Sequence, residues 1–188
     1  AVAIATRLMS PDLFSGWGVR TLTRSNPRFN PIGYHVGTVW PHDNSIAAMG
    51  FKMYGFEEHL NTLATALFDA SISFPYFRPP ELFCGDARTS QGSPVPYPVA
   101  CQPQSWAAGA FPLIVQAILG LKAEALERRL RVVNPRLPAW LNSVTVTDMR
   151  VGAGRVTLQF RRDGDHTRVE VRDVTPGIDV VLSTAWPL

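Results

Sequence analysis

The sequence predicts a mainly α-helical protein that ends in a small antiparallel β-structure, and two observations predict this fold class. Apolar side chains in residues 57–71 recur at the spacing of one helix face, whereas from residue 130 onward apolar and polar residues alternate as in half-buried strands. Hydrophobic residues make up 46% of the 188 residues and charged residues only 18%, which excludes an intrinsically disordered protein. We therefore expect a helical domain over residues 1–129 and a β-structure over residues 130–188.

Four helices are expected in the first domain. Residues 1–9 have the pattern of the end of a helix that a proline then stops, and residues 43–54 form a helix that begins with capping residue types. The helix over residues 57–71 is the clearest, because its apolar residues follow the i, i+3, i+4, i+7 rule. These residues are Leu60, Leu63, Ala64, Leu67 and Phe68. The fourth helix, residues 103–129, is apolar almost all round in its first half, which predicts burial on every side.

Four segments of the second domain are expected to be strands. Val156, Leu158 and Phe160 alternate with polar residues, and the next alternating segment follows after an Asp-Gly-Asp turn. The expected strands are residues 144–151, 156–161, 167–174 and 178–182.

Two long irregular stretches, residues 10–42 and 74–102, separate the expected helices. Connections of this length are usually functional or disordered, and the many aromatic residues in these stretches argue against disorder. If successive helices run antiparallel, the connection at Gly55 lies at one end of the helices and both long stretches lie at the other end. We therefore expect a functional site at that end, lined with aromatic, histidine and carboxylate side chains.

Composition and spacing argue against several functional classes. The net charge is +3, and the arginine cluster near residue 130 has no interleaved aromatic residues, so we expect no nucleic-acid partner. The longest apolar run, residues 105–121, is shorter than the ~20 residues of a membrane span. No zinc-type spacing links Cys84 to Cys101, and no phosphate loop, dinucleotide fingerprint or nucleophile elbow occurs. We expect a cytoplasmic protein with two free thiols, no metal and no cofactor, and we interpret the missing initiator methionine as the sign of a piece of a longer polypeptide.

The first candidate site lies in residues 33–44, where aromatic, histidine and acidic residues follow one another closely. Aromatic faces stack on the apolar faces of sugar rings, while His, Asp and Asn side chains bond hydroxyl groups, so this set suits a carbohydrate cradle. Its candidate substrate-binding residues are His35, Trp40, His42 and Asp43. The alternative is structural: Asp43 caps the following helix and Trp40 fills the core.

Glu81 is the candidate catalytic residue. It stands between prolines and aromatic residues in a loop, where partial burial would raise its pKa and suit general acid or base chemistry. The alternative is an ion pair with Arg78 or Arg88. Farther along the chain, Gln104 suits a bond to a sugar hydroxyl and Trp106 suits stacking, unless the two form an ordinary helix start with a core tryptophan.

Trp17 and Arg20 complete the candidate substrate-binding set. Trp17 is bracketed by two glycines, and Arg20 follows in the same stretch. A substrate clamp and a buried loop brace fit this pattern equally well.

Four blocks of the sequence carry a family resemblance. In chain order they are GWGVRT at residues 16–21, YHVGTVWPHDN at residues 34–44, PELFCG at residues 80–85 and YPVACQPQSWAAG at residues 97–109. Their order and spacing resemble the C-terminal part of bacterial glycogen-debranching-enzyme-like proteins of the amylo-α-1,6-glucosidase type. The resemblance covers about residues 1–150, and it extends more distantly to processing α-glucosidases and neutral invertases.

The resemblance implies an (α/α)6 toroid, of which this chain would form the C-terminal part, with the active site at one end. It implies an inverting glycosidase in which Glu81 is the general base and Trp40, His42 and Asp43 line the sugar subsite. The family's general acid lies on an earlier segment that this chain does not contain. We therefore expect the missing N-terminal half of the barrel, in the same polypeptide or in another chain, as a partner.

The leading functional hypothesis is the release of glucose from an oligo- or polysaccharide α-glucan by acid/base hydrolysis with inversion. Two alternatives stay open. One is a non-catalytic carbohydrate-binding or assembly module, and the other is an enzyme of the same fold that acts on another sugar.

Overall fold

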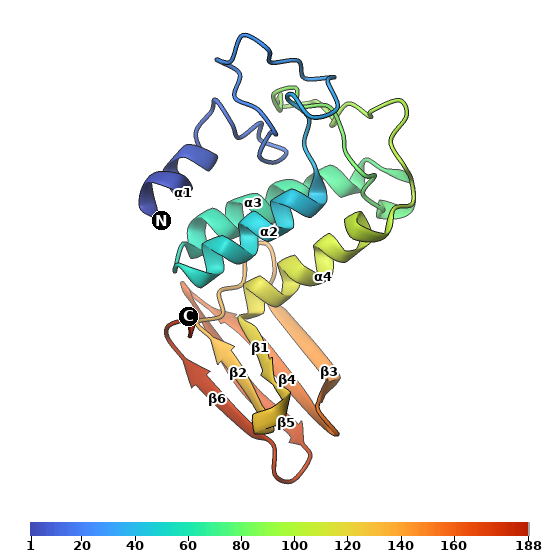
Figure 1. Cartoon of the computed structure of the whole chain (residues 1–188). Coiled ribbons are helices and arrows are strands. Elements are labelled where there is room, and N and C mark those ends of the chain that lie inside the picture. Colours follow the sequence, from blue (N-terminus) through green and yellow to red (C-terminus); the bar gives the residue numbers. More distant parts are fainter. Residues whose placement is uncertain (188) are drawn as a thin grey trace. The chain divides into compact units, whose positions relative to one another are not determined.

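The computed structural model describes residues 1–187, and the chain divides into two compact units, residues 1–114 and 115–188. Helices make up 30% of the structure and strands 26%, and the strands form two three-stranded sheets (Figure 1). The chain is therefore a small α/β protein. The prediction of a mainly α fold, and with it of the C-terminal part of an (α/α)6 toroid, is wrong. The expected domain boundary between residues 129 and 130 lies inside the second unit.

The error in fold class arises in the segment that follows α4 (Ser105–Leu119). This segment is rich in Leu, Lys, Ala, Glu and Arg, which are strong helix formers. Gly120 ends the helix with a φ of +67°, and a Cβ there would lie 1.9 Å from the carbonyl oxygen of Val133. The chain continues as β1 (Leu121–Glu124), which pairs antiparallel with β2 (Arg129–Val133). Pairing between strands thus overrides the local preference for helix.

The first unit contains α1 (Val2–Leu8), α2 (Pro41–Met53), α3 (Glu57–Ile72) and most of α4. Helices α2 and α3 form an antiparallel hairpin (Figure 1). Phe68 on α3 meets Phe111 on α4 with ring centroids 4.8 Å apart. Four of the five positions that the apolar spacing predicts for the inner face of α3 are buried, and the fifth, Phe68, is half-buried. The buried positions are Leu60, Leu63, Ala64 and Leu67.

Helix α2 begins two residues earlier than expected, at Pro41, because proline is well tolerated in the first turn of a helix. Trp40 occupies the N-cap position, and no side chain caps the helix. Asn44 lies inside the helix and is buried. Its amide group donates to the carbonyl oxygens of Val19 at 3.0 Å and Trp40 at 2.8 Å, and its Oδ1 accepts the N–H of Val19 at 2.7 Å. Asn44 therefore ties the preceding loop to the helix.

Single β-bridges organise the two long irregular stretches, and one of them, between Val39 and Phe83, joins the two stretches to each other. The other bridges lie within one stretch and join Phe14 to Val19, Arg20 to Val39, and Phe83 to Pro96. Val39 and Phe83 exchange two backbone hydrogen bonds of 2.9 and 3.0 Å, and both residues are buried. A Cβ at Gly85 would lie 1.7 Å from the carbonyl oxygen of Gly37, so the close approach requires glycine there. Both stretches adjoin the same end of the α2–α3 hairpin (Figure 1).

The second unit contains one antiparallel and one mixed sheet. β3 (Ser143–Val151), β4 (Gly154–Asp163) and β5 (His166–Val174) form an antiparallel meander. In the other sheet β2 lies between β1 and β6 (Asp179–Ser183), and β2 pairs in parallel with β6. This parallel pair corrects the expectation of a wholly antiparallel β-structure. Buried side chains from both sheets include Leu130, Val132, Leu158 and Phe160.

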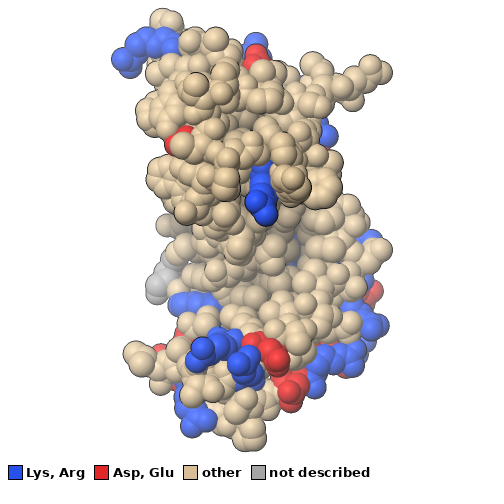
Figure 2. Space-filling model, turned by 90° about the vertical axis from the view of Figure 1, so that its right-hand side faces the viewer, with Lys and Arg blue, Asp and Glu red and all other residues tan. Residues whose placement is uncertain are grey.

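Charge is distributed unevenly between the two units. Residues 1–114 contain seven basic (Lys, Arg) and seven acidic residues, whereas residues 115–188 contain 11 basic and 8 acidic residues. The net charge of +3 therefore belongs to the second unit. On the face shown in Figure 2, charged side chains gather over the part formed by the strands.

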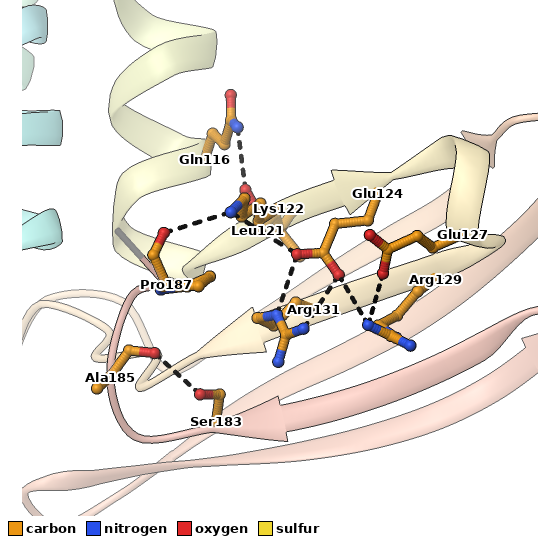
Figure 3. Close-up of polar contacts among 10 residues, drawn as sticks. All are labelled: Gln116, Leu121, Lys122, Glu124, Glu127, Arg129, Arg131, Ser183, Ala185 and Pro187. Carbon is orange, nitrogen blue, oxygen red and sulfur yellow. Dashed lines mark hydrogen bonds and ion pairs between the residues drawn. The ribbon is translucent and has the colours of Figure 1, made fainter.

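A charge network joins β1 to β2 (Figure 3). The carboxylate of Glu124 accepts hydrogen bonds from Arg131 at 3.2 and 3.1 Å and from Arg129 at 3.4 Å. The ammonium group of Lys122 lies 3.7 Å from the same carboxylate. The Arg131 hydrogen bond is the largest cause of a lowered pKa for Glu124. The network stabilises the β1–β2 pair through its side chains.

Candidate active site in the paired loops

Backbone hydrogen bonds fix the position of Glu81. Its N–H donates to the carbonyl oxygen of Cys101 at 3.0 Å, and Phe83, two residues on, is bridged to Val39. Three loop segments therefore meet around Glu81, and only 8% of the residue is exposed.

The carboxylate of Glu81 accepts two hydrogen bonds from separate segments of the chain. The Tyr34 hydroxyl donates to Oε1 at 2.6 Å, and the backbone N–H of Cys101 donates to Oε2 at 3.3 Å. The first bond is short, as is typical of a hydroxyl that donates to an ionised carboxylate. Each oxygen keeps acceptor capacity for one further donor, such as a water molecule.

These donors lower the pKa of Glu81, and the Tyr34 hydroxyl is the largest cause. Burial acts in the opposite direction but is outweighed. The expectation that burial would raise this pKa is therefore wrong. The two arginines considered as ion-pair partners have contacts elsewhere: Arg88 bonds Asp69 at 2.8 Å, and Arg78 lies over the Tyr76 ring.

Five rings from the paired loops and from the starts of α2 and α4 form an aromatic cluster. Its members are Tyr34, His35, Trp40, His42 and Trp106. His35 stacks on Trp40 with centroids 5.1 Å apart, and His42 stacks on Trp106 with centroids 4.7 Å apart. Tyr34 meets Trp40 edge to face at 4.8 Å, and the two tryptophans meet edge to face at 6.1 Å. Trp40 is buried at the centre, whereas Trp106 is 46% exposed and Tyr34 is 38% exposed.

The cluster joins four of the predicted site residues, His35, Trp40, His42 and Trp106, to Glu81 through Tyr34. Three rings are exposed, those of Tyr34, His35 and Trp106; Trp106 and Tyr34 provide apolar surface, and Glu81 provides a fixed acceptor. This arrangement can bind a flat, partly apolar molecule that carries hydroxyl groups.

Two further predicted residues lie at the starts of helices. Asp43 is in the first turn of α2, and its carboxylate lies 3.4 Å from Nδ1 of His42 and is 59% exposed. Oε1 of Gln104 accepts the N–H of Ala107 at 3.3 Å at the start of α4. Gln104 also lines a cavity of about 330 Å³ together with Phe77, Arg78, Pro79 and Phe111.

Trp17 and Arg20 are buried inside the loop packing. Nε of Arg20 donates to the carbonyl oxygen of Gly85 at 2.5 Å, so the guanidinium group joins the two long stretches. The Trp17 ring lies under the guanidinium group of Arg88 at 4.3 Å. The Arg20 contact is buried, whereas Arg88 is exposed, and both contacts join separate segments of the loops as braces would.

Sequence reasoning left out two of the groups that define this site. Tyr34 lies next to His35 in the motif at residues 34–44, whose histidines and tryptophan were predicted to bind a sugar. Its hydrogen bond to Glu81 could not be predicted, because no local sequence pattern indicates a contact with a residue 47 positions away. The second donor is the backbone N–H of Cys101, which any residue at that position would provide, so the residue type cannot indicate it. Both contacts depend on pairing between segments that are 47 and 20 residues apart.

The two cysteines differ in burial. Cys84 is buried and Cys101 is exposed, and both are free thiols.

Within residues 1–187, no group of three or more His, Cys, Asp or Glu side chains could hold a metal ion. Across the same residues, no helix has the length and apolar character needed to cross a membrane. No protein-family model matches the chain, and no curated protein matches it.

Proposed function

We propose that this chain carries the general base of a glycoside hydrolase of the amylo-α-1,6-glucosidase type, which releases glucose from α-glucans with inversion. One observation carries the proposal. The Glu81 carboxylate is fixed by two donors from separate segments, beside a cluster of partly exposed aromatic rings. A lowered pKa keeps this carboxylate ionised at neutral pH, where it can accept a proton.

In the proposed reaction Glu81 accepts a proton from a water molecule while the water oxygen attacks the anomeric carbon. A carboxylic acid on the opposite side of the sugar donates a proton to the glycosidic oxygen, and the bond between that oxygen and the anomeric carbon breaks. The two carboxyl groups of inverting enzymes are about 6.5–9.5 Å apart. The family that this chain resembles carries its general acid on an earlier segment, and the proposal takes the acid from such a segment.

The aromatic cluster is the proposed sugar-binding wall. Trp106 exposes nearly half of its surface, and His42 supports its ring from one side at an interplanar angle of 17°. A flat, supported ring suits the apolar face of a glucose unit. His42 and Asp43, which lie 3.4 Å apart, can bond hydroxyl groups at the edge of this wall.

The test is glucose release by the full product of the gene, in wild-type form and with Glu81→Gln. Gln keeps the shape of Glu and removes the proton acceptor. We expect kcat to fall 10²–10⁴-fold on short α-1,6 and α-1,4 glucans, the range that a positioned general base contributes. Binding of the glucan, measured by calorimetry, should change little. Proton NMR of the first product should show the β-anomer of glucose.

Glu170→Gln is the matched control, because Glu170 lies on β5 in the second unit and pairs there with Arg172. It should leave glucose release unchanged. If Glu81→Gln keeps more than about a tenth of the wild-type kcat, Glu81 is not the base.

A second candidate function is carbohydrate binding without catalysis, either as a binding or as an assembly module. It is favoured by the exposure of Trp106, which suits sugar stacking and needs no chemistry at Glu81. Under this function Trp106→Ala weakens glucan binding, the wild-type protein releases no glucose, and Glu81→Gln has no effect on binding. Hydrolysis of another sugar, such as a trehalose-like or mannosyl substrate, would leave Glu81 essential and change only the substrate class.

A further inference from the structure

The Tyr34 hydroxyl makes the shortest hydrogen bond to Glu81, at 2.6 Å. We propose that Tyr34 is a positioning residue for the reaction, which holds the Glu81 carboxylate in one orientation so that its free acceptor positions face the attacking water. This inference rests on the proposed function, because it concerns how Glu81 acts as a base. It assigns to Tyr34 a role that its place in the aromatic cluster alone would not give it.

Tyr34 is suited to position another group because its own backbone is fixed. Its carbonyl oxygen accepts the Thr38 hydroxyl at 2.7 Å and the indole N–H of Trp40 at 3.1 Å. The same indole N–H lies 3.0 Å from the Thr38 hydroxyl oxygen. The phenol ring is held edge to face against Trp40 at 4.8 Å and His35 at 4.5 Å. The hydroxyl therefore reaches Glu81 from a rigid support.

Each of the two donors binds a different oxygen of the Glu81 carboxylate. Tyr34 binds Oε1 and the Cys101 amide binds Oε2, so rotation of the carboxylate about its terminal bond would break both hydrogen bonds. A carboxylate held in this way presents its remaining lone pairs in one direction, and a base that is already oriented loses less entropy when it meets water. Removal of the Tyr34 hydroxyl leaves only the longer of the two bonds.

The hydrogen bond also favours the ionised form of Glu81. A hydroxyl donates more strongly to a carboxylate than to a carboxylic acid, which lowers the pKa of Glu81 and, reciprocally, raises the pKa of Tyr34 to about 12. A ring that served only for stacking would show no such coupling. The two roles of Tyr34 can therefore be separated by an experiment that removes the hydroxyl and keeps the ring.

Tyr34→Phe is that experiment, with Tyr54→Phe as the matched control. Tyr54 is exposed at the end of α2, outside the aromatic cluster. The Glu81 carboxyl carbon is followed by ¹³C NMR across a pH titration, and its resonance is assigned by its loss in Glu81→Gln. We expect the Glu81 midpoint to move to higher pH in Tyr34→Phe and to stay unchanged in Tyr54→Phe.

The kinetic arm uses the full gene product. The acid limb of the pH profile of kcat/KM should move to higher pH in Tyr34→Phe by the same amount as the NMR midpoint. At the optimum, kcat/KM should fall roughly 10–150-fold, the effect of losing one hydrogen bond to a charged group. KM should change less than kcat, because the ring remains in place.

The outcomes separate the two proposals. Active Tyr34→Phe protein with an unchanged Glu81 midpoint and an unchanged acid limb overturns the role of Tyr34 and leaves the proposed function standing. Wild-type protein that releases no glucose overturns the proposed function. A measurement that needs no Tyr34 variant covers the case in which Tyr34→Phe does not fold. In Glu81→Gln the pKa of Tyr34 should return from about 12 toward 10, and a value that stays near 12 overturns the coupling.

Discussion

Raising the pH from 8 to 10.5 is expected to stabilise the first unit, because Lys52 is buried there as an ammonium group. Its side chain on α2 has no exposed surface, and Nζ lies 3.7 Å from the carboxylate of Glu57 at the start of α3. Burial is the largest influence on the pKa of Lys52 and lowers it from 10.5 to about 8, although Glu57 acts in the opposite direction.

The size of the effect follows from this difference in pKa. Between pH 8 and 10.5 the unfolded chain still binds a proton at Lys52, whereas the folded chain has lost it, so the free energy of unfolding rises with pH across this window. The full difference corresponds to about 3 kcal/mol. Below pH 8 both states carry the proton and the folded state bears the full penalty of the buried charge.

The assay is urea unfolding of wild type and Lys52→Met at several pH values from 7 to 10.5, followed by circular dichroism of the helices. Met preserves the length of the side chain and removes the titrating group. The free energy of unfolding of Lys52→Met relative to wild type should fall by about 3 kcal/mol across this range. Lys122→Met is the matched control, since Lys122 lies in the second unit and is one-third exposed, and it should keep the wild-type rise. A constant difference between Lys52→Met and wild type would refute the assignment of a buried ammonium group.

Two further predictions concern a close backbone approach in the first unit and the charge network in the second. Gly85→Ala should destabilise the first unit by at least about 2 kcal/mol in thermal unfolding, because the new Cβ meets the carbonyl oxygen of Gly37. Gly50→Ala in α2, where nothing lies within 4 Å, should instead stabilise it by about 0.5–1 kcal/mol, and equal effects at both sites would contradict the close approach. In the second unit, Glu124→Gln should lower stability at pH 7. Because the pKa of Glu124 is lowered in the folded state, its contribution is complete above the unfolded value of 4.5 and is lost as the pH falls below it, so the variant and wild type should converge in acid denaturation series.

The sequence predicted the elements whose pattern is local and failed where pairing between distant segments decides. The apolar spacing of α3 led directly to its buried face, and the alternation in β4 led to its buried face in the same way. The segment after Gly120 alternates over only four residues, Leu121–Glu124, which is too short to outweigh its helix-forming composition. β1 pairs with β2, and β2 in turn pairs with β6, which lies about 50 residues farther along the chain. The pairing of β2 with β6 is not visible within a short window of sequence.

For the candidate site as well, residue types could be predicted from the sequence, whereas contacts between distant segments could not. The aromatic and histidine residues of the motif at residues 34–44 were visible as residue types, and four predicted residues do meet in the aromatic cluster. What the sequence could not provide is which donors reach Glu81, because this depends on the bridge between Val39 and Phe83. The predicted direction of the pKa shift of Glu81 was wrong for that reason, because the pKa is lowered and not raised. Burial can be guessed from prolines and aromatic neighbours, whereas hydrogen bonds from Tyr34 and Cys101 cannot.

The opposite behaviour of the two buried charges in the first unit explains why Glu81 suits a base better than an acid. For Lys52, burial outweighs the nearby carboxylate, and the group moves toward its neutral form. For Glu81, two hydrogen-bond donors outweigh burial, and the group is held in its charged form. A general acid must keep its proton near neutral pH, which requires a raised pKa, whereas a base must be ready to accept one. The environment of Glu81 therefore fits the proposed role of base, and a general acid would need surroundings that favour the neutral form of its carboxyl group.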